Sequence, residues 1–201
     1  MTDNPLADGL TIGSDGRPRC FWGAGSAEYM TYHDTEWGRP VHGDDALFER
    51  MTLEAFQSGL AWITILRKRE SFRAAFEGFS IAKVAAFSDA GATRLLGDAG
   101  IVRNRMKIDA ALHNAKVALD LPDGLAALLW SYAPEPRPRP ATRAGVAAST
   151  PESKAMAKGL KKLGFKFVGP TTAHALMQAT GMVDDHIEGC FVPLVRPVTE
   201  P

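Results

Sequence analysis

Cysteine is scarce in this chain, with only two among 201 residues. A disulfide-rich secreted fold is therefore excluded, and a single disulfide is not expected in a reducing compartment. Long apolar runs are also missing, because Glu54 and Gly59 interrupt the most apolar stretch, and no membrane-spanning segment is predicted. The first nineteen residues lack the apolar core of a secretory signal. We therefore expect a cytoplasmic protein whose residues 1–18 form a flexible tail.

Net charge is absent too, because 23 basic residues balance 23 acidic ones. Overall charge thus gives no indication of a nucleic-acid partner. Basic residues do gather locally, and the plain explanation for any one cluster is a solvated helix face. The clusters lie at 67–69, 103–107, 137–143 and 154–166.

Strand signals are few, and the best of them is the short stretch 165–168. Helix signals dominate, so an almost entirely all-α protein is predicted. The expected helices run from Asp44 or Asp45 to Phe56, and over 63–76, 81–87, 88–98, 103–119, 125–132, 151–163 and 170–180. Prolines at every second position of 134–140 forbid a helix and predict an extended linker at about 133–149.

The two cysteines each have a histidine at a suggestive distance. Cys20 precedes His33 by thirteen residues, and His186 precedes Cys190 by four. Two thiolates and two imidazoles make a good tetrahedral set for zinc, and four protein ligands leave no position for water. Such a site would be structural and would pin the two ends of the chain together. A buried free cysteine and a satisfied histidine remain the alternative.

Six motifs in a fixed order resemble the DNA-3-methyladenine glycosylase I family, which removes 3-methyladenine from alkylated DNA. They are RCFWG (19–23), YMTYHDTEWG (29–38), LEAFQSGLAWITILRKRE (53–70), LLGDAGIVRNRMKI (95–108), GFKFVGPTTAHALMQATG (164–181) and DDHIEGC (184–190). The resemblance implies the helix-hairpin-helix glycosylase fold, with residues 19–191 as one domain of two helical lobes around a base-binding cleft. Residues 192–201 are then a C-terminal tail. It also implies that the four cysteines and histidines bind a structural zinc ion.

The hairpin of this resemblance covers about 95–108. A glycine allows its turn, and the following helix offers N–H groups and positive side chains to a phosphate backbone. The residues expected to bind DNA there are Gly100, Arg103, Arg105 and Lys107. The chain departs from the wider superfamily at Val102, where a second glycine is usual. It also lacks the catalytic aspartate that most superfamily members carry after the hairpin.

Glu54 is the only ionisable side chain between Arg50 and Arg67. A carboxylate in so apolar a stretch either faces solvent, as an ordinary helical glutamate, or is held for a purpose. The resemblance matches it to the family's pocket glutamate, the residue that hydrogen-bonds the excised base. It further assigns Trp62 to stacking on the base and Tyr32 to its edge, with Trp22 and Tyr29 completing the wall. Core packing is the ordinary explanation for such aromatic residues.

The implied reaction is hydrolysis of the N-glycosidic bond of 3-methyladenine in double-stranded DNA. It releases the free base and leaves an abasic site without strand cleavage. The base must leave the duplex, and Gly59 and Leu60 are the candidates for the wedge that fills the gap. One cleft on one chain is sufficient, so a monomer is expected. Two rivals stay open: a zinc-stabilised DNA-binding module without catalysis, and a zinc hydrolase acting on small substrates.

Overall fold

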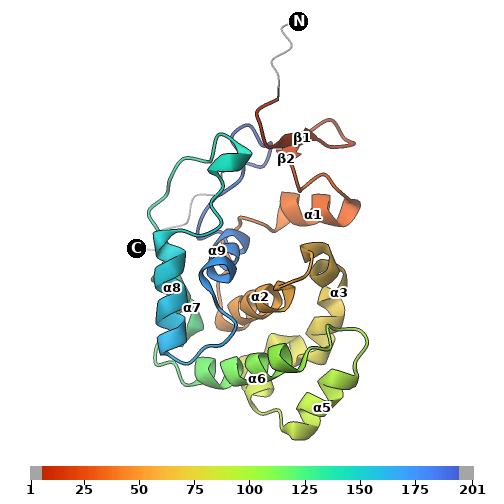
Figure 1. The fold of residues 1–201 in the computed structure, drawn as a ribbon, viewed down its shortest axis with the longest axis vertical. Coiled ribbons are helices and arrows are strands. Elements are labelled where there is room, and N and C mark those ends of the chain that lie inside the picture. Colours follow the sequence, from red (N-terminus) through yellow and green to blue (C-terminus); the bar gives the residue numbers. More distant parts are fainter. Residues whose placement is uncertain (1–5, 195–201) are drawn as a thin grey trace, which may run out of the picture. The chain divides into compact units, whose positions relative to one another are not determined.

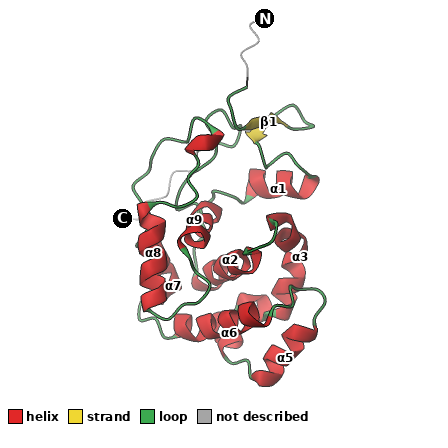
Figure 2. Ribbon diagram, in the orientation of Figure 1, coloured by secondary structure: helices red, strands yellow, loops and turns green. Residues whose placement is uncertain are grey.

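A computed structural model describes residues 6–194 of the chain, and nearly all of its regular structure is helical (Figure 1). Figure 2 shows the same chain with its helices in red and a single small patch of strand in yellow. The prediction of an almost all-α protein is confirmed. No helix within residues 6–194 is both long and apolar enough to cross a membrane.

The chain divides into two compact units. The first contains three separate segments: the residues up to Pro40, residues 134–148, and the residues from Met177 onward. The second contains residues 41–133 and 149–176.

The second unit is a helical cluster. Its elements are α2 (Asp44–Gln57), α3 (Trp62–Ala75), the 3-10 turn η1 (Glu77–Phe79), α4 (Ile81–Ala85), α5 (Asp89–Gly97), α6 (Arg105–Leu119), α7 (Gly124–Trp130), α8 (Pro151–Lys162) and most of α9 (Pro170–Ala179). Helix α2 contacts α3, α4, α6 and α7, so it is the centre of this unit. Residues 51–56 are all buried, so this part of α2 is covered on every face.

Local sequence explains where the best-defined helices begin. Thr150 accepts a hydrogen bond from the backbone N–H of Ser153 and the Ser153 hydroxyl oxygen accepts one from the Thr150 N–H, which forms a capping box before Pro151. This confirms the predicted start of α8. Helix α6 begins at Arg105, two residues later than predicted, because the Asn104 side chain accepts from the N–H of Lys107 and caps it there.

The first unit contains little regular structure. Strand β1 (Leu10–Ile12) pairs antiparallel with β2 (Pro18–Cys20), and helix α1 (Ala27–Thr35) and the 3-10 turn η2 (Arg143–Gly145) complete its elements. Part of the segment predicted as a flexible tail is therefore a hairpin. Strands of three residues are too short to produce an alternating pattern in the sequence.

The strand predicted at 165–168 is wrong. The backbone of Phe167 is in the left-handed region at φ 57°, which interrupts an extended strand. The Asn114 side chain takes the place of a strand partner, since it donates to the carbonyl of Lys166 at 3.0 Å and accepts from its N–H at 2.8 Å. One side-chain amide from α6 thus satisfies the backbone groups that a second strand would have satisfied.

Residues 134–140 of the proline-rich segment form neither helix nor strand, and they are fastened to the C-terminal segment of the first unit. Arg139 forms an ion pair with Asp184 at 2.9 Å and Arg137 reaches Asp185 at 3.2 Å. The N–H of Glu188 donates to the Pro140 carbonyl at 2.9 Å. The segment is therefore part of the packed unit, although its alternating prolines suggested a linker.

Candidate functional site

Two cysteines and two histidines come together in the first unit, as the sequence predicted. Cys20 ends β2, His33 lies in the last turn of α1, and His186 and Cys190 follow α9. All four are buried, and their ligand atoms lie within 4.8 Å of one another. His186 and Cys190 are brought together by a turn, in which the Cys190 N–H donates to the Ile187 carbonyl, and not by a helix. The cluster joins the N- and C-terminal regions of the chain.

The spacing of the ligand atoms suits a small tetrahedral ion. Nδ1 of His186 is 3.6 Å from both sulfur atoms, and Nε2 of His33 is 3.6 Å from the Cys190 sulfur. Zinc bonds of about 2.0–2.3 Å require neighbouring ligand atoms about 3.3–3.8 Å apart in a tetrahedron. The donor set and its spacing therefore fit a metal ion bound by four protein ligands.

Each histidine uses its other ring nitrogen for an outer contact. Nδ1 of His33 lies 2.9 Å from the carboxylate of Asp34, and Nε2 of His186 lies 3.3 Å from the carbonyl oxygen of Trp37. Both acceptors favour a proton on the nitrogen that faces them, which leaves Nε2 of His33 and Nδ1 of His186 unprotonated for an ion. Outer contacts of this kind fix the ring orientation and the tautomer of metal ligands.

Asp34 is itself held by a buried arginine. The guanidinium of Arg19 donates to Asp34 at 2.8 and 2.9 Å and to both carboxylate oxygens of Asp15 at 2.6 and 2.7 Å. Burial raises the pKa of Asp34, but the hydrogen bonds from Arg19 and His33 outweigh that effect and lower it. The sequence interpretation missed Arg19 and Asp34, although each directly adjoins a predicted ligand.

The two thiols respond to each other. A hydrogen bond between them, together with burial, raises the pKa of Cys20, and the same hydrogen bond, helped by His186 and His33, lowers the pKa of Cys190. One sulfur thus holds a negative charge more readily than two, because adjacent buried thiolates repel. A divalent cation would offset that repulsion and allow both to ionise.

Aromatic rings surround this cluster. Trp22 makes edge contacts with Trp37, His33 and Tyr29 at centroid separations of 4.9, 5.1 and 5.9 Å. The ring of Trp37 in turn contacts His186 at 4.7 Å. Trp22 therefore packs on the cysteine–histidine cluster, which is an ordinary structural reason for its presence beside any role in a pocket wall.

Glycine allows the backbone to approach one ligand closely. A Cβ atom added at Gly23 would lie 2.6 Å from the ring of His33. No other residue fits at such a distance, so the sequence RCFWG places a ligand and the space for a second ligand within four positions.

Glu54 lies on α2, the central helix of the second unit. It is 6% exposed, and burial raises the pKa of its carboxyl to about 8, although the nearby charge of Arg50 acts in the opposite direction. Among the hydrogen bonds of residues 6–194, none involves this carboxyl group. The exposed helical glutamate considered as an alternative is excluded. A buried carboxyl that lacks hydrogen bonds and has a perturbed pKa is typical of a ligand-binding site.

The predicted base-stacking residue and wedge follow Glu54 in the same unit. Helix α2 ends at Gln57, the turn contains Gly59 and Leu60, and Trp62 begins α3. Gly59 needs its glycine for a φ of 79°, and Leu60 is 40% exposed. Tyr32, Trp22 and Tyr29 belong to the first unit, so the structure groups the predicted base-binding residues only within each unit.

Helices α5 and α6 are adjacent and joined by residues 98–104, so the hairpin predicted at about 95–108 spans the end of α5 and the start of α6. Gly100 is needed for space and not for its φ, since an added Cβ atom would lie 3.0 Å from the Cβ of Ser71. Its N–H already donates to Asp98 at 2.7 Å. Arg103 is exposed, and the exposed Arg105 pairs with Asp109 at 2.9 Å.

Lys107 differs from the prediction. Its side chain is buried, and its ammonium group donates to the carbonyl oxygens of Phe56 at 2.8 Å and Ser58 at 2.5 Å. The phosphate contact predicted for Lys107 is therefore corrected to an internal one. A sequence shows a basic cluster but not which member of it a neighbouring helix end will bind.

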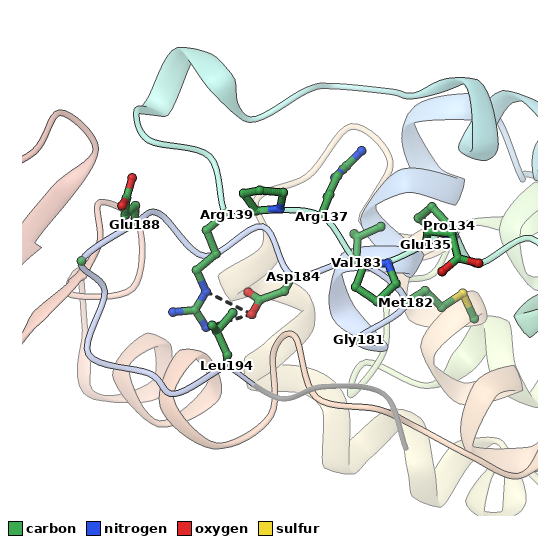
Figure 3. Close-up of a pocket in the computed structure, with 13 residues that line it drawn as sticks. Pro134, Glu135, Arg137, Arg139, Gly181, Met182, Val183, Asp184, Glu188 and Leu194 are labelled. Carbon is green, nitrogen blue, oxygen red and sulfur yellow. Dashed lines mark hydrogen bonds and ion pairs between the residues drawn. The ribbon is translucent and has the colours of Figure 1, made fainter. Parts of the chain in front are cut away.

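A cavity of about 740 Å³ lies in the first unit, between the proline-rich segment and the residues after α9 (Figure 3). Figure 3 shows Arg139 and Asp184 pointing toward each other in its wall. The described residues that line it include charges of both signs but no aromatic ring. This cavity lacks the groups needed to stack a nucleobase, so we do not assign base binding to it.

Known proteins resemble the chain over most of its length. DNA-3-methyladenine glycosylase 1 of Escherichia coli strain K12 is 44% identical over 177 residues, covering 86% of this chain and 95% of that protein. The corresponding Haemophilus influenzae enzyme is 40% identical over 178 residues, with 86% and 96% covered. A solved structure of 3-methyladenine DNA glycosylase I from Staphylococcus aureus, determined to explain 3-methyladenine recognition, is 32% identical and covers 87% of this chain and 96% of its own, with a TM-score of 0.82. Residues 22–193 match the family described as methyladenine glycosylase, and the chain belongs to that family.

Proposed function

We propose that this chain excises 3-methyladenine from alkylated double-stranded DNA by hydrolysing the N-glycosidic bond. Relatives that bear this activity in their names match it over 86% of its length. The observation that carries the proposal is Glu54, a buried carboxyl free of hydrogen bonds on the central helix of its unit. Such a group is costly unless a ligand uses it.

The chemistry of the lesion suits this carboxyl group. Methylation at N3 gives the adenine of the nucleotide a positive charge, and a carboxylate attracts it while accepting its donor edge. A cationic ring also stacks favourably on an electron-rich indole, by roughly 0.5–2 kcal/mol for each contact. We assign the stacking ring to Trp62 and the edge contact to Tyr32, with Trp22 and Tyr29 as further wall residues. Unmodified adenine is neutral and gains less from every one of these contacts.

Water is the proposed nucleophile. The methylated base leaves as a neutral molecule, so its bond to the sugar is already weak and no general acid is required. No lysine is assigned as a nucleophile, so the reaction stops at the abasic site without cutting the strand. Glu54 acts in recognition, because its carboxylate attracts the cationic methylated base and has no such attraction for unmodified adenine, which is neutral.

DNA is proposed to contact the second unit through the hairpin and the turn before α3. Gly100, Arg103 and Arg105 would meet the phosphate backbone, and Gly59 and Leu60 would fill the gap left by the extruded nucleotide. One chain is sufficient for this reaction, and the monomer predicted from the sequence remains part of the proposal. An enzyme with this substrate works where DNA is, which agrees with the cytoplasmic location expected from the sequence.

Zinc is the proposed ion of the cysteine–histidine cluster, with a structural role. Four protein ligands leave no open position for a reactive water molecule, which argues against the zinc hydrolase alternative. When bound, the ion supplies a cross-link between Cys20 and Cys190, near the two ends of the chain. The chain's own contribution is the orientation of both histidines by Asp34 and the Trp37 carbonyl.

A DNA-binding module without catalysis is the remaining alternative. Incubation of the purified protein with methylated DNA, followed by chromatography of the released bases, separates the two. The proposed enzyme releases free 3-methyladenine, and the Trp62→Ala variant loses that release while it keeps its fold. Tight binding to DNA with no released base would support the non-catalytic module instead.

A further inference from the structure

We infer that Lys107 is a positioning residue, which fixes the turn that carries Leu60 and Trp62 relative to the hairpin that anchors DNA. The inference rests on the proposed function, since it concerns how that site is aligned with its substrate. Lys107 lies in the first turn of α6, four residues after Arg103 and two after Arg105. Its ammonium group donates hydrogen bonds to backbone carbonyls at the end of α2.

The contact is specific in position and charge. Phe56 lies in the last turn of α2 and Ser58 is its C-cap, directly after Gln57, so both carbonyl oxygens belong to a helix C-terminus. That last turn contains no basic residue of its own. An ammonium ion at this end satisfies carbonyls without helical partners and interacts favourably with the helix dipole. Lys107 forms no ion pair with any carboxylate among residues 6–194, so its only described side-chain partners are these two oxygens.

The backbone that Lys107 contacts is followed directly by Leu60 and Trp62, the residues proposed to contact the DNA and the base. Gly59 follows Ser58 with a φ of 79°, and the N–H of Leu60 donates back to the Gln57 carbonyl at 2.6 Å. Leu60 and Trp62 are two and four residues from Ser58. A shift of the Ser58 carbonyl would therefore move the wedge and the stacking ring together.

A second lysine holds the turn between the two helices of the hairpin. Lys68 of α3 donates to the carbonyl oxygens of Ala99 at 3.0 Å and Gly100 at 3.2 Å. Helices α2 and α3 flank the turn that contains Gly59 and Leu60. Both are thus hydrogen-bonded to the hairpin, α3 through Lys68 and α2 through Lys107. The ammonium groups of Lys68 and Lys107 therefore hold these helices and the hairpin in place, and they do not contact phosphate.

The test compares Lys107→Met, which keeps the length of the side chain without its charge, with Arg105→Met on the exposed side of the same helix. For Lys107→Met we expect single-turnover excision to slow by about tenfold to a hundredfold, because small misplacements of reacting groups have effects of that size. The salt dependence of DNA binding should be unchanged. Arg105→Met should instead lower the slope of log Kd against log salt by about 0.9, as loss of one phosphate contact does.

The melting temperature of each variant serves as the folding control, since it does not depend on how Leu60 and Trp62 are aligned with DNA. Lys107→Arg is the second variant, because it preserves charge but places a larger, planar donor against the same carbonyls. It should melt normally and still excise more slowly. Wild-type excision rates in both Lys107 variants, or a reduced salt slope in Lys107→Met, would overturn the inference.

Failure of the proposed function would be seen separately, as a wild-type protein that releases no base. The alignment of Leu60 with DNA can then be measured without base excision, from the fluorescence of 2-aminopurine placed opposite an abasic-site analogue. Insertion of Leu60 in the wild type should unstack that base and raise its fluorescence, and Lys107→Met should give a smaller rise. Equal fluorescence in the two proteins would contradict a positioning role for Lys107.

Discussion

Replacing Glu54 by glutamine should stabilise the protein at neutral pH while it damages excision. Burial holds the pKa of this carboxyl at about 8 in the folded chain, against an ordinary value of 4.5. Below pH 4.5 the group is protonated in both the folded and the unfolded states, and its ionisation has no effect on stability. As the pH rises from there toward 8, the unfolded state loses its proton first, and the free energy of unfolding falls.

The size of this effect follows from linkage. The free energy of unfolding of the wild type falls by about 1.4 kcal/mol for each pH unit in that interval, or by about 3 kcal/mol at pH 7. Glutamine has the same shape and no proton to lose. The Glu54→Gln variant should therefore be more stable than the wild type by about 3 kcal/mol at pH 7, and the advantage should shrink toward zero near pH 4.5.

Urea unfolding of both proteins at several pH values between 5 and 8 measures this difference. Glu135→Gln is the matched control, because Glu135 is exposed and its replacement should change stability little at any pH. In parallel, kcat/KM of the wild type should rise with pH through about 8, as the base-binding carboxyl ionises, and Glu54→Gln should lose that rise. A variant that is less stable than the wild type at pH 7, or a stability difference independent of pH, would refute the claim that burial raises the pKa of the Glu54 carboxyl.

Three further outcomes are expected. Cys190→Ser should lose one zinc ion per chain by elemental analysis and about 3–5 kcal/mol of stability by chemical unfolding, because the cross-link between the chain ends is lost. His113→Gln, outside the cluster, should keep its zinc and its stability. A Cys190→Ser protein with full metal content would disprove the ligand assignment. Asp34→Asn should release zinc to a chelator about tenfold to a hundredfold faster, since His33 loses its charged partner, and an unchanged release rate would contradict the role of that contact. Trp62→Ala should reduce excision of 3-methyladenine without lowering the melting temperature by more than a few degrees, and retention of full activity would remove Trp62 from the pocket.

The sequence predicted most of the helices, because their ends are determined by neighbouring residues. Thr150, Pro151 and Ser153 define the start of α8 within four positions, and Gly164 follows its last turn with φ 98°. The wrong strand at 165–168 had a different origin. Its backbone is satisfied by Asn114, some fifty residues away, and no local pattern reports such a partner.

The cysteine–histidine cluster was predictable because cysteine is rare, which left few ways to assemble four such side chains. The outer contacts were not predictable with equal ease. Asp34 adjoins His33, but aspartate is common on helix surfaces, and only the fold shows that a fully buried Arg19 holds it. The Trp37 carbonyl that orients His186 has no side-chain signal at all.

The hairpin illustrates the same limit for charge. Arg103, Arg105 and Lys107 are one basic cluster in the sequence, yet two are exposed and the third is buried against a helix end. The charge of a residue alone does not distinguish a side chain that could contact phosphate from one that hydrogen-bonds to a helix end inside the protein. Glu54 was distinguishable for the opposite reason, because it is the sole ionisable residue in a long apolar stretch. The structure shows that its side chain is buried.

The most direct test of the account is the identity of the base released from methylated DNA by the wild type and by Glu54→Gln. The wild type should release 3-methyladenine selectively and leave abasic sites in strands that stay intact until alkali is added. Glu54→Gln, although more stable at pH 7, should release it far more slowly. Equal release by both proteins, or a wild type that frees unmodified adenine as readily, would contradict recognition of a cationic base by this carboxyl group.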